Sequence, residues 1–314
     1  MVIRAIAIIP RMSSPPSQDQ PPVPMSIGAG AADPPAAQST ILTGKKSVRI
    51  VTFLLSYLIL GILVIVAIQR AIMSPTSYTR TVPQGIASWG IVALILCAIL
   101  FFAFILRRLN GRMMYELLFG IALFLGVWVY CWDVIPWDIG LLVASLATII
   151  YASVRRVIVH DLYMLLGAAG IAIHFAFLFS TNAYAAVLVT FVFYDMVVGR
   201  AKGLAERMAS AAIRRGAIPG LIIPSRLSGF GSLVSTEIKD SGSVFLGAGD
   251  LILPLTLVAR AAALGWYQAI AAVIGILAGA FWLGNRRSAV SFPALVPLVT
   301  GGAIGLAIAI FIRI

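Results

Sequence analysis

Nine apolar segments follow one another along most of the chain, and they limit its fold more than any other feature of the sequence. A helix that crosses the hydrocarbon core of a bilayer needs about 20 predominantly apolar residues. The breaks between the segments are short and polar, or contain Pro and Gly, except for one longer basic stretch. We expect nine transmembrane helices, at about 50–68, 86–106, 115–131, 139–154, 162–179, 183–199, 244–262, 266–283 and 293–312.

The composition agrees with this interpretation. The 314-residue chain is 61% hydrophobic and 11% charged, with a mean hydropathy of +1.03, whereas soluble domains are about 45–50% apolar. A soluble domain cannot bury so much apolar surface. The sequence therefore predicts an all-α polytopic membrane protein that crosses the cell membrane several times.

Positive charge predicts the direction of the helices, because cytoplasmic segments carry an excess of Lys and Arg. With the N-terminus in the cytoplasm, 19 of the 23 Lys and Arg residues lie on the cytoplasmic side. The remaining four are Arg70, Arg80, Arg260 and Arg313. The net charge of +12 then reflects topology, so it gives no reason to expect nucleic-acid binding. Nine helices place the C-terminus outside.

The chain divides into four parts. Residues 1–46 are Pro-rich and are expected to form a disordered cytoplasmic tail. Residues 47–199 hold helices one to six, 200–243 a basic cytoplasmic loop, and 244–314 helices seven to nine. The two cysteines and two histidines are too scattered for a metal site, and no metal or organic cofactor is implied.

Two of the eleven acidic residues lie inside apolar segments, Asp195 in FVFYDMVVGR and Asp250 in FLGAGDLIL. A carboxylate at membrane depth costs about 2.5–3.5 kcal/mol, so such a residue is a functional hypothesis by default. Asp195 precedes Arg200 by five residues and Asp250 follows Val244 by six, which places both about 7–9 Å inside the cytoplasmic boundary. A single buried acid often serves as an interhelical tether, but two at one depth favour chemistry.

The residues beside the acids suit close approach. Gly247 and Gly249 carry no side chains, which permits another helix or a substrate chain to come near Asp250. Pro254 withholds the N–H that would bond the carbonyl of residue 250. A Gly-Ala-Gly run is also typical of a plain packing face, and Tyr194 fits packing and site lining equally well.

Two neighbouring carboxylates cannot both ionise cheaply, so they share one proton. The ionised carboxylate can take a proton from water while the protonated one polarises a peptide carbonyl. This is general acid–base hydrolysis without a covalent intermediate. The titration belongs to the pair, so the sequence does not identify the base.

A third stretch lies at the same depth. The ninth segment opens SFPALVPL, with Pro293, Ala294 and Leu295 six to eight residues beyond Arg287. A proline near a helix start leaves backbone groups free to bond another chain, such as a substrate backbone. An ordinary helix start is the alternative.

In this order, YD at 194–195, GAGD at 247–250 and PAL at 293–295 resemble the presenilin and signal peptide peptidase family of GxGD intramembrane aspartyl proteases. The resemblance implies a presenilin-like fold with Asp195 and Asp250 as the catalytic pair. It implies that Pro293, Ala294 and Leu295 shape the site and help to place the substrate. Tyr194, Gly247, Ala248 and Gly249 are further candidate substrate-binding residues. The implied substrates are transmembrane-helix proteins or peptides, such as membrane-protein or signal-peptide remnants, met within membrane lipid. Homo-oligomer formation stays open.

The cytoplasmic N-terminus resembles presenilin rather than signal peptide peptidase, whose orientation is reversed. A short chain without the large eukaryotic loop resembles the archaeal homologues. A proton- or cation-coupled transporter could also use two buried aspartates, but it would more often show repeated halves and broken helices. Prepilin peptidases share GxGD with fewer spans and no PAL segment, and a structural scaffold is the remaining alternative.

The stretch SLVSTEIK at 232–239 alternates two sets of side chains and is rich in strand formers. A strand here could bond an unwound substrate segment edge to edge, and the resemblance implies a strand in this region. A plain amphipathic linker is an equal alternative to this predicted strand.

Overall fold

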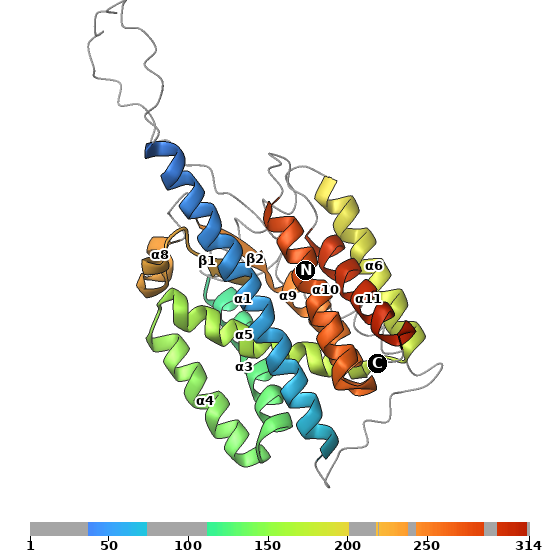
Figure 1. The fold of residues 1–314 in the computed structure, drawn as a ribbon. Coiled ribbons are helices and arrows are strands. Elements are labelled where there is room, and N and C mark those ends of the chain that lie inside the picture. Colours follow the sequence, from blue (N-terminus) through green and yellow to red (C-terminus); the bar gives the residue numbers. More distant parts are fainter. Residues whose placement is uncertain are drawn as a thin grey trace, which may run out of the picture.

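A computed structural model describes residues 37–73, 112–200, 218, 220–237, 243–285 and 294–312, and helices dominate these ranges (Figure 1). The long helices are α1 (Ala37–Met73), α3 (Arg112–Val134), α4 (Trp137–Ser153), α5 (Val157–Leu178), α6 (Thr181–Arg200), α9 (Ala248–Leu264), α10 (Trp266–Asn285) and α11 (Leu295–Phe311). The short elements are β1 (Gly220–Ile223), the 3₁₀ helix η1 (Leu227–Gly231), α8 (Val234–Glu237) and β2 (Val244–Gly247). The segment expected at 86–106 lies outside the described residues.

Within the described ranges, three helical segments are long and apolar enough to cross a membrane: Val48–Ala71, Val157–Leu178 and Trp266–Asn285. Shorter apolar helices run over Phe119–Val134, Trp137–Ser153 and Leu295–Phe311. The prediction of a mostly helical chain with candidate membrane-spanning helices is therefore confirmed. The total of nine spans and their direction stay predictions.

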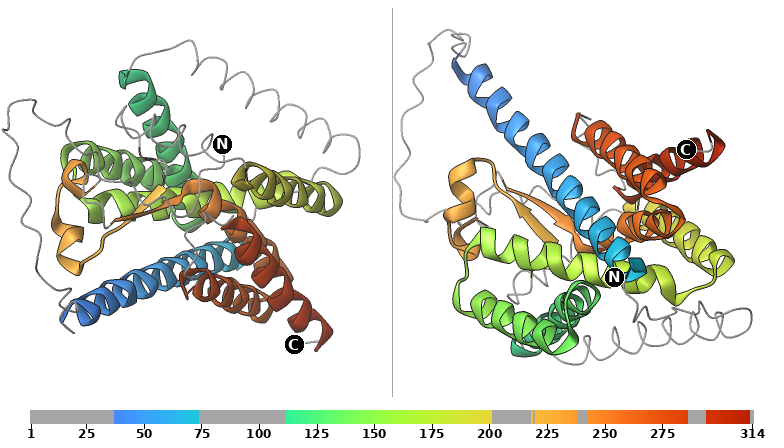
Figure 2. Two further views of the ribbon diagram at one scale, coloured as in Figure 1. Left: turned by 90° about the horizontal axis from the view of Figure 1, so that it is seen from above. Right: turned by 60° about the horizontal axis from the view of Figure 1, so that its bottom comes forward.

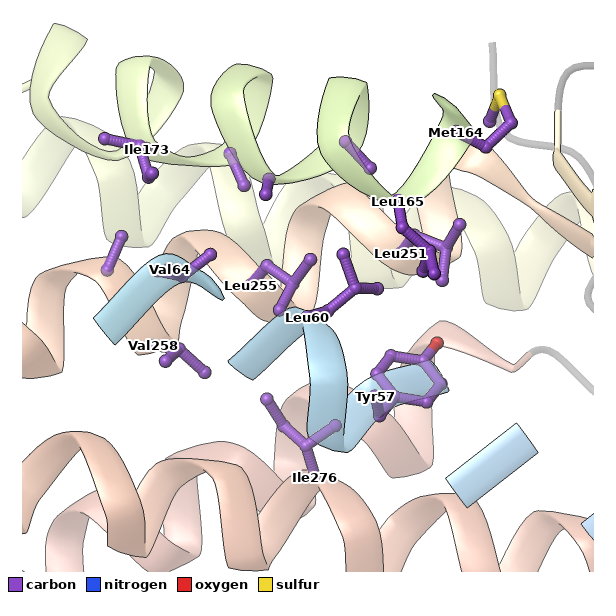
Figure 3. Packing of buried hydrophobic residues seen from close by; sticks show 14 of the residues in the cluster. Tyr57, Leu60, Val64, Met164, Leu165, Ile173, Leu251, Leu255, Val258 and Ile276 are labelled. Atoms are coloured by element: carbon purple, nitrogen blue, oxygen red, sulfur yellow. The ribbon is translucent and has the colours of Figure 1, made fainter. Parts of the chain in front are cut away.

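Helix α9 lies at the centre of the fold. It contacts α1, α5, α10, α11 and both strands, so its side chains are buried along most of its length. Figure 3 shows how this core packs, with Leu60 and Val64 of α1 beside Leu255 and Val258 of α9. Asp250, in the first turn of α9, is therefore removed from the surface.

Small residues let neighbouring helices approach closely. A side chain at Gly126 of α3 would collide with the carbonyl oxygen of Gly167 on α5. A side chain at Gly275 of α10 would likewise meet the carbonyl oxygen of Gly301 on α11. These contacts need residues without a Cβ, as is common where membrane helices pack. The second of these contacts brings α11, which begins at Leu295, close against α10.

Strands β1 and β2 pair antiparallel, with Gly220 opposite Gly247 and Ile223 opposite Val244. Figure 2 shows them with α8 on one side of the helices, next to α5. The expectation that the seventh helix begins at 244 is therefore wrong, because Val244–Gly247 form a strand and α9 begins at Ala248. A short buried strand and the start of a buried helix show the same unbroken apolar run.

The predicted strand at 232–239 is also absent where the structure describes it. Glu237 accepts hydrogen bonds from the Ser232 hydroxyl (2.9 Å) and the Ser243 hydroxyl (2.6 Å). These bonds fold the segment back on itself, so residues 234–237 form the helical turn α8. Leu233 keeps only an isolated bridge to Arg156. Residues 238 and 239 lie outside the described ranges.

Helix α1 begins at Ala37, inside the segment expected to be a disordered tail. Pro35 is the last proline before it, and Ala36 to Lys46 contain no proline to interrupt a helix. The helix therefore extends ahead of its apolar part. Residues 1–36 lie outside the described ranges.

Candidate active site

Asp250 lies where strand β2 turns into helix α9. Gly247 ends the strand and is the N-cap of the helix, so Asp250 is in the first helical turn. Its side chain is 0% exposed. Both carboxylate oxygens are buried and have no hydrogen-bond partner among the described residues, although the backbone N–H of Gly247 is close enough to act on them electrostatically. A buried carboxylate with so little support is unusual in a structural role.

Asp195 lies on α6 and is 4% exposed. Its Oδ2 accepts a hydrogen bond from the backbone N–H of Leu295, at 3.1 Å. Leu295 begins α11, and the first N–H groups of a helix have no partner within it and carry the positive end of the helix dipole. The start of α11 therefore holds the carboxylate of Asp195.

The structure thus brings together all three predicted motifs where they are described. Asp195 is close enough to Asp250 for the two charges to interact. Leu295 bonds Asp195 directly, and Ala294 beside it is 1% exposed. Pro293 lies outside the described residues. The acids therefore share one region, between the starts of α9 and α11 and the C-terminal half of α6.

The surroundings of the acids are apolar. Leu253 of α9 packs with Leu295 and Val299 of α11, and partly buried side chains of α5 and α6 cover this cluster. In such a medium two neighbouring carboxyls cannot both carry charge without a large penalty. The arrangement suits a pair that holds one proton between its members.

The remaining predicted site residues lie around this pair with different exposure. Gly247 is buried, whereas Ala248 and Gly249 are half-buried. Tyr194 is 44% exposed on the surface of α6, as expected for a residue that precedes Asp195 by about 100° on a helix. Their part in substrate binding stays a prediction.

Helix α5 holds the outer edge of strand β1 through two polar side chains that the sequence analysis did not single out. His160 donates its Nε2–H to the carbonyl oxygen of Gly220 at 2.9 Å, and Asp161 accepts from the N–H of Ile222 at 2.9 Å. Both side chains are buried. Alternate residues of a strand point to opposite edges, so Gly220 and Ile222 face α5 while Leu221 and Ile223 face β2.

The same alternation defines the second edge of the sheet. Leu246 and Val244 face their partners on β1, so Phe245 and Gly247 direct their N–H and C=O groups away from it. This outer edge of β2 ends at Gly247, three residues before Asp250. The sheet therefore has one edge held by α5, and its other edge ends close to Asp250 along the chain. Two apolar runs were the available signal for these strands: GLII within the basic loop and VFLG directly after it.

The far end of α9 is fixed by Arg260. Its guanidinium donates to the carbonyl oxygens of Ala176 (2.8 Å) and Phe179, and to the hydroxyl oxygen of Thr181 (3.1 Å). It also lies 4.5 Å from the ring centroid of Tyr184. These groups belong to the end of α5, the turn after it and the start of α6. Arg260 therefore ties α9 to the turn between α5 and α6.

No family model matches the chain, and no curated protein matches it. The solved structures that are similar include two of a presenilin family intramembrane aspartate protease, one in space group C222 and one in P2. The first aligns with a TM-score of 0.55 and 20% identity over 82% of this chain and 95% of that chain. The second aligns with a TM-score of 0.56 and 21% identity over 83% and 97%.

These alignments extend over almost the whole length of both relatives, so the likeness concerns the complete fold rather than one helical bundle. The chain has a presenilin-like fold, and the expectation drawn from its three motifs is confirmed at this level.

Proposed function

We propose that this chain is an intramembrane aspartic endopeptidase that hydrolyses peptide bonds of transmembrane segments with Asp195 and Asp250. The observation that carries the proposal is the buried acid pair. Asp250 has no hydrogen-bond partner for its carboxylate among the described residues, and Asp195 lies within its field. The fold that holds them is shared with presenilin-family intramembrane aspartate proteases.

The chemistry follows from one proton shared by two carboxyls. The ionised member takes a proton from a water molecule, whose oxygen attacks the scissile carbonyl carbon. The protonated member donates to the carbonyl oxygen, which gives a tetrahedral diol. Collapse of the diol breaks the C–N bond. The carboxyl that gained the water proton passes it to the leaving amine, and the other carboxylate takes a proton back from a diol hydroxyl. Low polarity around the pair strengthens each of these electrostatic steps.

Substrate would bind as an extended segment beside β2. A transmembrane helix has every backbone group bonded internally, so its scissile carbonyl is protected until the helix unwinds. The outer edge of β2, formed by Phe245 and Gly247, offers backbone groups to such a segment by β-augmentation. Because α5 holds the other edge of the sheet, the extended substrate would pair with the outer edge of β2. This edge ends at Gly247, three residues before Asp250.

The membrane arrangement belongs to the same proposal. We assign nine transmembrane helices, a cytoplasmic N-terminus and an outside C-terminus to a multi-pass protein of the cell membrane. The three long apolar helices and the uneven distribution of Lys and Arg support this assignment. The substrates are then transmembrane-helix proteins or peptides that reach the enzyme through the lipid. Tyr194 and the segment Gly247–Gly249 are proposed to contact them.

Incubation of the purified protein in detergent with a transmembrane peptide tests the function. We expect peptide-bond cleavage that a hydroxyl-containing mimic of the diol inhibits. The rate should follow a bell-shaped pH profile, since one acid and one base are needed together. Reconstituted vesicles test the alternative, a proton- or cation-coupled transporter: ion-driven uptake without any peptide cleavage would overturn the protease assignment.

A further inference from the structure

Proline 254 creates a defect in α9 beside Asp250. It lies inside the helix, four residues after the acid. A helical N–H bonds the carbonyl four residues earlier, and proline has no N–H. The backbone carbonyl of Asp250 therefore lacks its partner within the helix, in the turn that carries the carboxylate.

Helix α1 supplies the missing donor. The Tyr57 hydroxyl donates to the backbone carbonyl oxygen of Asp250 at 2.8 Å, across 193 residues of sequence. Tyr57 is 1% exposed, and Phe53 packs edge-on against its ring with 5.2 Å between the centroids. Figure 3 shows the ring within the core. The hydroxyl is thus held in one place by the packing of its ring.

A second bond joins the same two helices farther along. Gln69 donates its amide N–H to the carbonyl oxygen of Ala262 at 3.2 Å, again across 193 residues. Equal separations mean that α1 and α9 run parallel in one register. The two bonds are twelve residues apart, or about 18 Å along a helix. Only the Tyr57 bond ends on the residue that carries the proposed catalytic carboxyl.

We propose that Tyr57 is a positioning residue for Asp250: its hydroxyl replaces the N–H that Pro254 lacks and fixes the first turn of α9 opposite Asp195. The inference rests on the proposed function. Its reason is that the acid lies at a strand-to-helix junction, where Pro254 supplies no N–H to the backbone carbonyl of Asp250. A shift of about 1 Å in a reacting group can cost on the order of 100-fold in rate.

The first test removes only the hydroxyl. Tyr57→Phe keeps the ring and its packing, and we expect kcat to fall about 10- to 100-fold with KM nearly unchanged. Gln69→Leu is the matched control, because it breaks the other α1–α9 bond and leaves Asp250 untouched. We expect its kcat to stay at the wild-type value. Thermal unfolding of both variants separates loss of position from loss of fold.

The second test restores the donor from within the helix. Pro254→Ala returns an N–H to position 254, so the double variant Tyr57→Phe/Pro254→Ala should regain most of the lost kcat. A merely structural tyrosine would show no such rescue. Wild-type kcat in Tyr57→Phe, or absence of rescue in a double variant that folds normally, overturns the inference.

Hydrogen exchange gives a readout that does not need activity. Amides of the β2–α9 junction should exchange faster in Tyr57→Phe than in Gln69→Leu, and the double variant should reverse this change. Wild-type protein that cleaves no peptide would contradict the proposed function alone. Unchanged exchange at the junction would contradict the role of Tyr57 whether or not the protein cleaves.

Discussion

The two ends of α9 each carry one charged residue, and their surroundings differ. Toward the C-terminal end of α9, Arg260 donates to three oxygen acceptors and lies against the ring of Tyr184. At the N-terminal end, both carboxylate oxygens of Asp250 are buried without a hydrogen-bond partner among the described residues. Structural charges in a protein interior are normally satisfied, and exceptions concentrate at functional sites. The comparison assigns stability to one end of the helix and chemistry to the other.

The largest expected effect is on catalysis by the acid pair at the N-terminal end of α9. Asp195→Asn should lower peptide cleavage by about 10³-fold or more, because an amide cannot share the proton that general acid–base catalysis needs. Cleavage of a transmembrane peptide, followed by mass spectrometry, measures it. Asp138→Asn on the exposed first turn of α4 is the matched control and should cleave normally. Equal losses of cleavage in both variants would contradict a catalytic role specific to Asp195.

The next largest effect is on stability, through Arg260 near the C-terminal end of α9. Arg260→Met removes three hydrogen bonds and leaves buried carbonyl oxygens without donors, so the free energy of unfolding should fall by about 2–3 kcal/mol. Thermal unfolding in detergent measures this loss. Arg226→Met, at an exposed position, should change the unfolding temperature little. If Arg260→Met unfolds like wild type, the comparison between the two ends of α9 loses its structural half.

The edge of β2 gives a smaller effect that has a distinctive pattern. N-methylation of single backbone nitrogens in the substrate peptide removes one donor at a time. Pairing with Phe245 and Gly247 predicts that kcat/KM falls about five- to tenfold at alternate positions near the scissile bond, because one hydrogen bond is lost at each. Intervening positions should tolerate the change. An even loss at all positions would speak against strand pairing.

The smallest effect is expected where α5 holds β1. In Asp161→Asn the amide oxygen can still accept from the N–H of Ile222, so cleavage should stay within about threefold of wild type. Asp161→Leu lacks the acceptor and should lower both cleavage and the unfolding temperature further. Identical behaviour of the two variants would show that the hydrogen bond to β1 does not matter to the site.

The helices were the part of the fold that the sequence could predict. The run expected at 266–283 corresponds to α10 at Trp266–Asn285, and 139–154 to α4 at Trp137–Ser153. Long apolar runs leave few alternatives to a helix, because a bilayer leaves no backbone group unbonded. The same argument is silent on Val244–Gly247, where four apolar residues fit a buried strand and a helix start equally.

Asp195 and Asp250 could be found from the sequence because charge is rare in these apolar segments. The residues that bond the site from distant parts of the chain could not be found in this way. Local sequence indicated that Pro254 deprives the carbonyl of residue 250 of its donor, yet nothing near it in the chain identifies Tyr57, 193 residues away. His160 and Asp161 likewise bond β1 about 60 residues later. Such contacts depend on how the helices pack, which hydrophobic pattern alone does not specify.

Asp250→Asn measures the central claim most directly, because cleavage and unfolding temperature can be followed in one variant. The account predicts that cleavage is lost while the unfolding temperature stays equal to that of wild type or rises, since a neutral amide is less costly to bury than a charge. Retained cleavage would contradict the assignment of the acid pair. A fall in unfolding temperature as large as that of Arg260→Met would show that Asp250, too, serves the fold.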